Sequence, residues 1–207
     1  SIIVAIENGG KDLIRVIDNG CGMNADDAML AFERHSTSKI KTVEDITHIG
    51  SLGFRGEALP SIASVSKLHL VTRTAEEEMA TIVEYANGKL NNVTKTSANI
   101  GTAVTVRGLF KDLPARRKFL KTAAVEARHI IKYIHYQALV YPQISFWLVI
   151  DDKEKLNYIA CPERKQRIEE VFGSGFFADD VIPVEGKYND YYVSGYIFGL
   201  EDRADKL

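Results

Sequence analysis

The chain has 207 residues, of which 45% are hydrophobic and 26% are charged, and its formal net charge is -2. This is the composition of a globular protein with a sizeable core. The chain as a whole has no excess of basic residues of the kind that favours binding to nucleic acid. Cys21 and Cys161 lie far apart without CxxC spacing, which argues against a disulfide framework and a zinc site and favours a reducing compartment. We found no signal-like segment and no apolar run near the roughly 20 residues of a membrane helix, so we expect a cytoplasmic protein.

The elements predicted for the first third of the chain are a β-hairpin followed by short helices. Two β-branched runs at 2–6 and 13–17 flank Asn8-Gly9-Gly10, which is typical of a hairpin turn. A glycine-containing loop at 18–23 leads into a helix over 25–34 that Asn24 can cap. A polar loop, a short helical turn at 43–49 and a helix from residue 55 or 56 to 64 follow.

The remaining elements are mostly strands, which indicates an α+β fold. Strands are predicted at 67–73, 80–85, 89–94, 102–107, 144–150, 155–160 and 191–198, and helical segments at 114–119, 125–140 and 168–172. Adjacent hairpins favour an antiparallel or mixed sheet over a doubly wound parallel sheet. The weakest seam lies near Cys161-Pro162, so we expect one domain over 1–160 and the beginning of a second over 161–207.

The first candidate site is the loop that begins at Asp18, with the sequence DNGCGM. A carboxylate at the end of a strand can accept a hydrogen bond from an exocyclic amine such as that of adenine. The glycines beside it let the backbone approach a flat ring. An ordinary turn is the alternative, because Asp-Asn-Gly is also common turn chemistry.

The second candidate is the stretch SLGFRGEALPSI, with Gly53 and Gly56 before a helix. Backbone N–H groups at a helix start can bind phosphate, although the stretch matches neither the Walker nor the dinucleotide fingerprint. A helix preceded by a turn is the alternative. The preceding polar loop supplies Thr37, Ser38 and Lys39, which suit phosphate contacts in a lid and equally suit a solvated loop.

Two further features are weaker when taken alone. Thr102 follows Gly101 at the start of a predicted strand, where its hydroxyl can support a base-reading carboxylate or simply favour the strand. The segment PARRKFLK places Arg116, Arg117 and Lys118 together, with more basic residues on the next helix. This patch can contact a phosphate backbone, or it can be a solvated helical face.

The order of these motifs resembles the GHKL ATPase superfamily, which includes gyrase, histidine kinases and MutL. Within that superfamily, DNGCGM, RHSTSKI, SLGFRGEALPSIASVS, GTAVTV and LPARRKFLK look like the N-terminal ATPase domain of the MutL family of DNA mismatch repair proteins. The resemblance runs from Ser1 to about Phe198. It implies the Bergerat two-layer sandwich, a mixed sheet with helices on one face, followed by a ribosomal S5-like α/β domain.

The resemblance also implies ligands and roles. Asp18 would read the adenine amine of ATP with Thr102 beside it, and the lid would hold the phosphates together with the glycine-rich loop. The residues implied to shape the adenine site are Gly20, Gly22 and Met23; those of the lid are Thr37, Ser38 and Lys39; those of the phosphate loop are Gly53, Phe54, Arg55, Gly56, Glu57, Ala58 and Leu59. The loop acts mainly through backbone N–H groups, with Arg55 and Glu57 holding its shape.

One departure concerns hydrolysis. In this family the general-base Glu and the Mg²⁺-binding Asn come from a helix that precedes the first strand. The resemblance therefore assigns no catalytic or metal-binding residue to this chain, and we expect this fragment by itself to hydrolyse ATP poorly or not at all.

The resemblance implies ATP and Mg²⁺ as cofactors and a homodimer that closes on ATP binding. It also implies DNA and a MutS-type mismatch-recognition protein as partners, and a location near the bacterial nucleoid and away from the membrane. The alternative is a non-catalytic DNA-binding clamp module with a vestigial nucleotide site.

Overall fold

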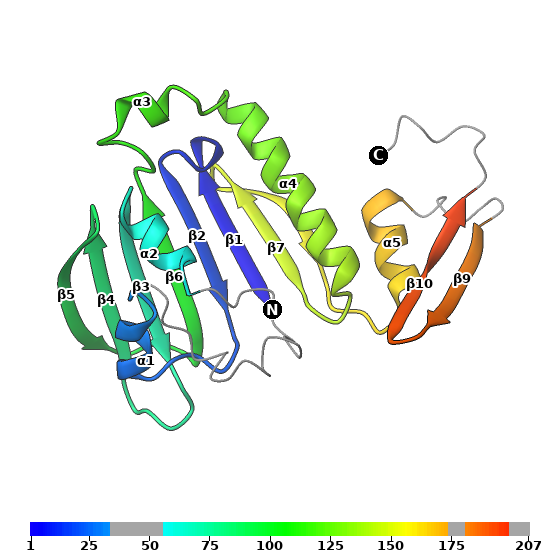
Figure 1. Ribbon diagram of the computed structural model, residues 1–207, viewed down its shortest axis with the longest axis horizontal. Coiled ribbons are helices and arrows are strands. Elements are labelled where there is room, and N and C mark those ends of the chain that lie inside the picture. The colour runs from blue at the N-terminus through cyan, green and yellow to red at the C-terminus, as the bar shows by residue number, and fades with distance from the viewer. Residues whose placement is uncertain (34–55, 174–180, 199–207) are drawn as a thin grey trace.

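The computed structural model describes residues 1–33, 56–173 and 181–198 (Figure 1). In chain order the elements are β1 (Ile2–Glu7), a 3-10 turn η1 (Asn8–Gly10), β2 (Leu13–Asp18), α1 (Ala25–Leu30), α2 (Ala58–Ala63), β3 (Lys67–Arg73), β4 (Ala80–Ala86), β5 (Lys89–Thr96), β6 (Gly101–Arg107), α3 (Pro114–Arg117), α4 (Ala123–Val140), β7 (Phe146–Ile150), β8 (Lys153–Tyr158), α5 (Arg164–Phe172), β9 (Val181–Tyr188) and β10 (Tyr191–Phe198).

The first eight strands form one sheet in the order β5-β4-β3-β6-β2-β1-β7-β8. Every neighbouring pair is antiparallel except β1 and β7, which run parallel. A parallel pair needs a long crossover, and the segment between these two strands contains β2 to β6 and α4. The mixed sheet predicted from the sequence is confirmed.

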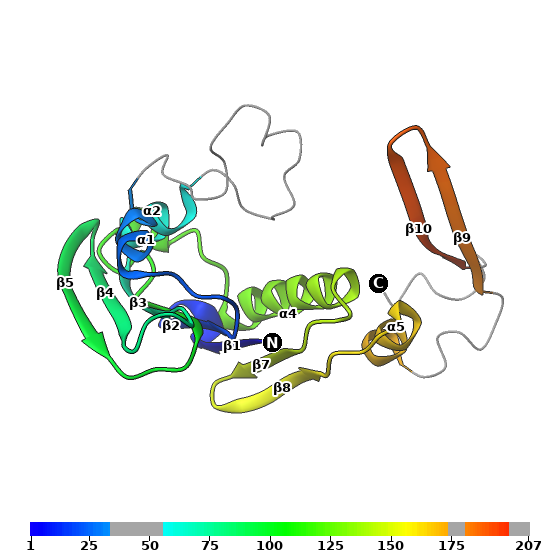
Figure 2. The same cartoon turned by 90° about the horizontal axis from the view of Figure 1, so that it is seen from below.

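Helices α1, α2 and α4 cover one face of this sheet, as the view from below shows (Figure 2). Two buried clusters lie between the helices and the strands, and Ile14 of β2 packs against both. One cluster consists of Val4, Ile6, Ile134, Ala138, Phe146, Leu148 and Tyr158. The other consists of Ala28, Phe32, Ala63, Leu68, Leu70, Val83 and Val106. Together they make the predicted two-layer α+β architecture.

The predicted strands of the main sheet and the long helix α4 are confirmed to within two residues at their ends, and the shorter helices differ from prediction. Helix α3 ends at Arg117 instead of residue 119, and α5 begins at Arg164 instead of residue 168. Helix α1 ends at Leu30 instead of residue 34, where the Ala31 N–H closes the last turn on the Asp27 carbonyl. Helix α2 begins at Ala58 instead of 55 or 56, because Gly56 has a φ of 62°, outside the right-handed helical region. The predicted turn at 43–49 lies outside the described residues.

Strand β9 was missed, because Pro183 and Gly186 weaken the strand pattern, yet it pairs with β10 along its whole length. This hairpin is a separate two-stranded sheet. The domain boundary near residue 160 stays a prediction. Helix α5 lies beyond that boundary, and its buried Arg167 contacts residues that precede the boundary.

Arg167 ties α5 to the segments around β7 and β8. Its Nη2 donates to the carbonyl oxygens of Pro142, Ile144 and Ile159, at 2.9, 3.2 and 2.7 Å. Its guanidinium lies 5.3 Å from the centre of the Tyr158 ring. Cys21 and Cys161 are both free thiols. In the part of the chain that the structure describes, no helix is long and apolar enough to cross a membrane.

Candidate functional site

The strongest candidate site lies where β2 ends, on the face of the sheet that the helices cover. Asp18 is the last residue of β2 and pairs with Thr102 at the start of β6. Thr102 in turn pairs with Thr72 near the end of β3. Residues directly opposite one another on neighbouring strands point to the same face, so the three side chains form a polar row. The sequence predicted two members of this row and missed Thr72.

The Asp18 carboxylate is held by the backbone through one oxygen only. Oδ1 accepts from the Gly20 N–H at 2.8 Å and from the Thr102 N–H at 3.3 Å. Among the described residues, Oδ2 accepts no hydrogen bond. The loop therefore fixes the orientation of the carboxylate and leaves one acceptor available to a ligand.

Two glycines bring the surrounding backbone close to this row. Gly22 has a φ of 72°, and a Cβ there would lie 2.0 Å from the Arg73 carbonyl oxygen. Gly101 has a φ of 122°, and a Cβ there would lie 2.2 Å from the carbonyl oxygen of Asp18. Only glycine fits both positions without a backbone shift. Gly22 thus lets the loop cross the end of β3, a packing reason that the sequence did not reveal.

Thr72 connects the loop to the row. Its Oγ1 accepts from the Met23 N–H at 2.9 Å, lies 3.0 Å from Thr102 Oγ1, and lies 3.1 Å from the Gly101 carbonyl oxygen. Only 1% of Thr72 is exposed. A threonine in a strand carries no distinctive sequence signal, and its importance depends on β3 lying beside β6, which could not be derived from the chain order.

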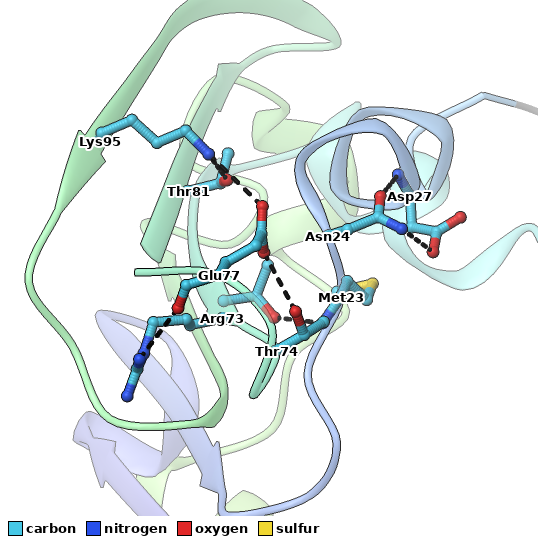
Figure 3. A network of polar contacts seen from close by, with 9 residues as sticks. Met23, Asn24, Asp27, Arg73, Thr74, Glu77, Thr81 and Lys95 are labelled. Carbon is cyan, nitrogen blue, oxygen red and sulfur yellow. Dashed lines mark hydrogen bonds and ion pairs between the residues drawn. The ribbon is translucent and has the colours of Figure 1, made fainter. Parts of the chain in front are cut away.

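The polar row continues to the edge of the sheet. Thr81 of β4 pairs with Thr72 and, on its other side, with Lys95 of β5. Lys95 Nζ donates to Thr81 Oγ1 at 2.9 Å and lies 3.6 Å from the Glu77 carboxylate (Figure 3). Arg73 donates to the Glu77 carbonyl oxygen at 3.1 Å. These contacts anchor the loop after β3, next to the site.

Helix α1 follows the site loop, and its first turn is well capped. The Asn24 side chain accepts from the Asp27 N–H at 2.8 Å and donates to the Asp27 carboxylate at 2.9 Å (Figure 3). This confirms the cap predicted from the sequence. Beyond the helix, Phe32 stacks on Tyr85 with ring centres 4.3 Å apart. Burial, together with the negative charge of Glu33, raises the pKa of Tyr85, so this phenol stays neutral.

The predicted phosphate loop is described only at its end. Gly56 and Glu57 precede α2, and Ala58 and Leu59 open it. Leu59 and Met23 pack against the same buried cluster, so the start of α2 and the loop after Asp18 share one core. The other predicted phosphate and lid residues, Thr37, Ser38, Lys39, Gly53, Phe54 and Arg55, lie outside the described residues.

The basic segment lies at the other end of the same strands. Leu13 pairs with Arg107 at the end of β6, and α3 follows there, whereas Asp18 and Thr102 are at the opposite end. Arg116, Arg117 and Lys118 are exposed. The structure therefore brings Asp18, Gly20, Gly22, Met23 and Thr102 together and keeps the basic segment apart from them (Figure 1).

The chain is similar to curated MutL proteins over most of its length. It is 45% identical to the DNA mismatch repair protein MutL of Solibacter usitatus over 190 residues, 92% of this chain and 29% of that protein. It is 44% identical to MutL of Opitutus terrae over 95% of this chain and 31% of that protein. The chain thus spans about a third of the length of these relatives. No protein-family model matches it.

Solved structures give the same result. The MutL ATPase domain of Aquifex aeolicus complexed with ADP is similar with a TM-score of 0.67 and 31% identity, over 89% of this chain and 64% of that one. The N-terminal domain of a DNA repair protein is similar with a TM-score of 0.73 and 29% identity, over 94% of this chain and 61% of that one. The fold is that of a GHKL ATPase domain.

Within that class, the chain belongs to the MutL family of DNA mismatch repair proteins, and it corresponds to their N-terminal ATPase domain.

Proposed function

We propose that this chain belongs to the ATP-binding domain of a MutL-type mismatch repair protein, which in the intact protein hydrolyses ATP and acts as an ATP-gated clamp that links mismatch recognition to repair. The observation that carries the proposal is the Asp18 carboxylate, fixed by two backbone N–H groups through Oδ1 and left with Oδ2 available. A carboxylate accepts only, so it suits the exocyclic amine of adenine. The ADP complex of a neighbour that is 31% identical supports a nucleotide as the ligand.

The remaining roles follow the chemistry of each segment. Thr102 stands beside Asp18, and the loop containing Gly20, Gly22 and Met23 borders the base. The N–H groups of residues 53–59, which include Gly56 and Leu59, provide donors for the phosphates. Preorganised donors of this kind stabilise the charge that develops during phosphoryl transfer. We assign Glu57 to the shape of this loop and not to proton transfer.

Mg²⁺ is proposed as the companion of ATP. The described residues contain no group of three or more His, Cys, Asp or Glu side chains that could hold a metal by itself. Magnesium in nucleotide sites is usually bound by one or two carboxylates together with phosphates and water. We therefore infer that the ion arrives with the nucleotide, whose phosphate charge it would neutralise.

DNA is the proposed macromolecular ligand of the basic segment, with a MutS-type protein and a second copy of the chain as further partners. Arg116, Arg117 and Lys118 are exposed on α3 and just after it, far from Asp18 along the strands. Contacts to phosphate backbones weaken steeply with salt. If Arg116→Glu with Arg117→Glu leaves DNA affinity and its salt dependence unchanged, this segment is not the contact. Because we propose DNA as a ligand, we also propose that the protein is located near the bacterial nucleoid.

The decisive experiment for nucleotide binding is Asp18→Asn in the intact protein. The amide oxygen can still accept from the loop, whereas the amide nitrogen now presents donors to the adenine amine. We expect ATP affinity to fall by roughly 10- to 100-fold, the scale of a lost charge-assisted hydrogen bond. Equilibrium binding of fluorescent ATP measures this.

Asp26→Asn is the matched control, because Asp26 is an exposed carboxylate on α1 next to the site. It removes the same charge at a similar place and should leave ATP affinity unchanged. Equal affinities of the Asp18 variant and the wild type would overturn the proposal. A non-catalytic DNA clamp with a vestigial nucleotide site would then be favoured, a function that the present similarities do not favour.

A further inference from the structure

The Thr72 hydroxyl has three polar neighbours and a single proton. The Met23 N–H can only donate to it, and the Gly101 carbonyl oxygen can only accept from it, at 2.9 and 3.1 Å. The third neighbour, Thr102 Oγ1 at 3.0 Å, can do either. A hydroxyl group donates one hydrogen bond and accepts up to two.

Only one proton arrangement makes all three contacts hydrogen bonds. Thr72 donates its proton to the Gly101 carbonyl oxygen, so it must accept from both Met23 and Thr102. Because Thr72 is 1% exposed, a contact left without a hydrogen bond there would not be replaced readily by water. The arrangement therefore directs the Thr102 proton towards Thr72.

This direction decides what the site offers to a ligand. With its proton engaged, the Thr102 hydroxyl presents only lone pairs, and the neighbouring Asp18 Oδ2 also only accepts. Asp18 and Thr102 stand directly opposite each other on adjacent strands, so they act on the same ligand edge. The pair therefore presents only hydrogen-bond acceptors to the ligand. Such a pair can bind a ligand N–H donor but cannot form a hydrogen bond with a ligand carbonyl oxygen.

We propose that Thr72 is a positioning residue that sets base selectivity by taking the Thr102 proton, so that the Asp18–Thr102 pair selects 6-amino purines and rejects 6-oxo purines. This inference rests on the proposed nucleotide function and adds a residue that contacts no ligand. Unpaired polar groups in such a site give strong discrimination, because a buried acceptor facing another acceptor loses its water without gaining a partner.

The first test uses the wild-type intact protein and three triphosphates: ATP, inosine triphosphate, which carries an oxygen at position 6, and the unsubstituted purine nucleotide. An acceptor-only edge predicts the affinity order ATP, then unsubstituted purine, then inosine triphosphate. If inosine triphosphate binds as well as the unsubstituted purine or better, the site does not reject 6-oxo purines and the inference is wrong. If none of the three binds, the proposed nucleotide function fails as well.

The second test replaces the hydroxyl of Thr72. Thr72→Val keeps the shape of the side chain and releases the Thr102 proton, which can then donate to a 6-oxo group. We expect the ratio of ATP affinity to inosine triphosphate affinity to shrink by roughly tenfold, the scale of one hydrogen bond. Thr72→Ser keeps the hydroxyl and should restore the wild-type ratio.

A purely structural role gives a different result. Thr72 also holds the Met23 N–H, so Thr72→Val is expected to weaken the binding of both nucleotides to some extent through the loop. A structural effect lowers both affinities by the same factor and leaves their ratio unchanged. An unchanged ratio in Thr72→Val therefore overturns the inference while the proposed nucleotide function stands.

Discussion

The two halves of the hydrophobic core share one sheet but are covered by very different helices. The cluster under β1 and β7 is covered by α4, which has 18 residues. The cluster under β3 and β4 is covered by α1 and α2, which have six residues each. Helices of six residues are not stable alone, so the second half depends on caps and tertiary contacts.

The candidate site lies in the half with the short helices. Asp18 and Met23 lead into α1, and Met23 packs against the cluster below it. Segments of low local stability are where ligand-dependent movement is usually found. From this difference we expect the half covered by α4 to be the more stable one, and the stability of the site half to depend on a bound ligand.

The largest effect should come from the same truncation made in each half. Leu148 of β7 and Leu70 of β3 are both fully buried. Leu→Ala at either position should lower the free energy of unfolding by about 2–5 kcal/mol, the usual cost of lost burial and a cavity. Denaturant unfolding measures this loss.

The two variants should differ in nucleotide binding. Leu70 lies two residues before Thr72 on β3 and faces the same side of the sheet, so its loss should disturb the site and lower ATP affinity. Leu148 lies in the other cluster, and its variant should bind ATP normally once folded. Equal ATP affinities for both variants would show that the two halves are not energetically distinct.

A smaller effect is expected from the helix caps. Asn24→Ala removes the bonds to Asp27 at the start of α1 and should destabilise the protein by about 1 kcal/mol. Thr122 is the N-cap residue of α4 but makes no side-chain cap hydrogen bond, so Thr122→Ala is the control and should have little effect. Thermal unfolding of both variants distinguishes them; a larger loss in Thr122→Ala would reverse the comparison.

How much of this structure could be predicted from the sequence depends on how far apart in the chain the interacting residues are. The strands and the Asn24 cap follow from patterns within a few residues, and the order of motifs indicated the family. The partnership of Thr72 with Thr102 depends on β3 pairing with β6, which are separated in sequence by β4 and β5. Such non-local neighbours leave no local pattern, so no residue type at position 72 could have revealed it.

Arg167 illustrates the same limit outside the site. Its position in a polar helix is typical of a solvated face, yet the side chain is fully buried beneath three backbone carbonyl groups. Those carbonyl groups belong to Pro142, Ile144 and Ile159, which only the folded chain brings together. A buried arginine cannot be distinguished from an exposed one by periodicity alone.

The smallest expected effect concerns pH and the half covered by α4. His135 of α4 lies edge-on to Tyr158, with ring centres 5.9 Å apart, and its Nε2 is buried without a hydrogen-bond partner among the described residues. Burial lowers the pKa of His135 below its usual value near 6.5. As the pH falls through that value, the unfolded chain binds a proton that the folded chain does not, so the folded state loses stability.

His135→Gln removes this contribution and should show a smaller loss of stability between about pH 7.5 and 5.5 than the wild type. Thermal unfolding at both values measures it, with His129→Gln, at an exposed position on the same helix, as the control. If the two variants and the wild type lose the same stability on acidification, the buried imidazole does not contribute to the acid sensitivity of this half.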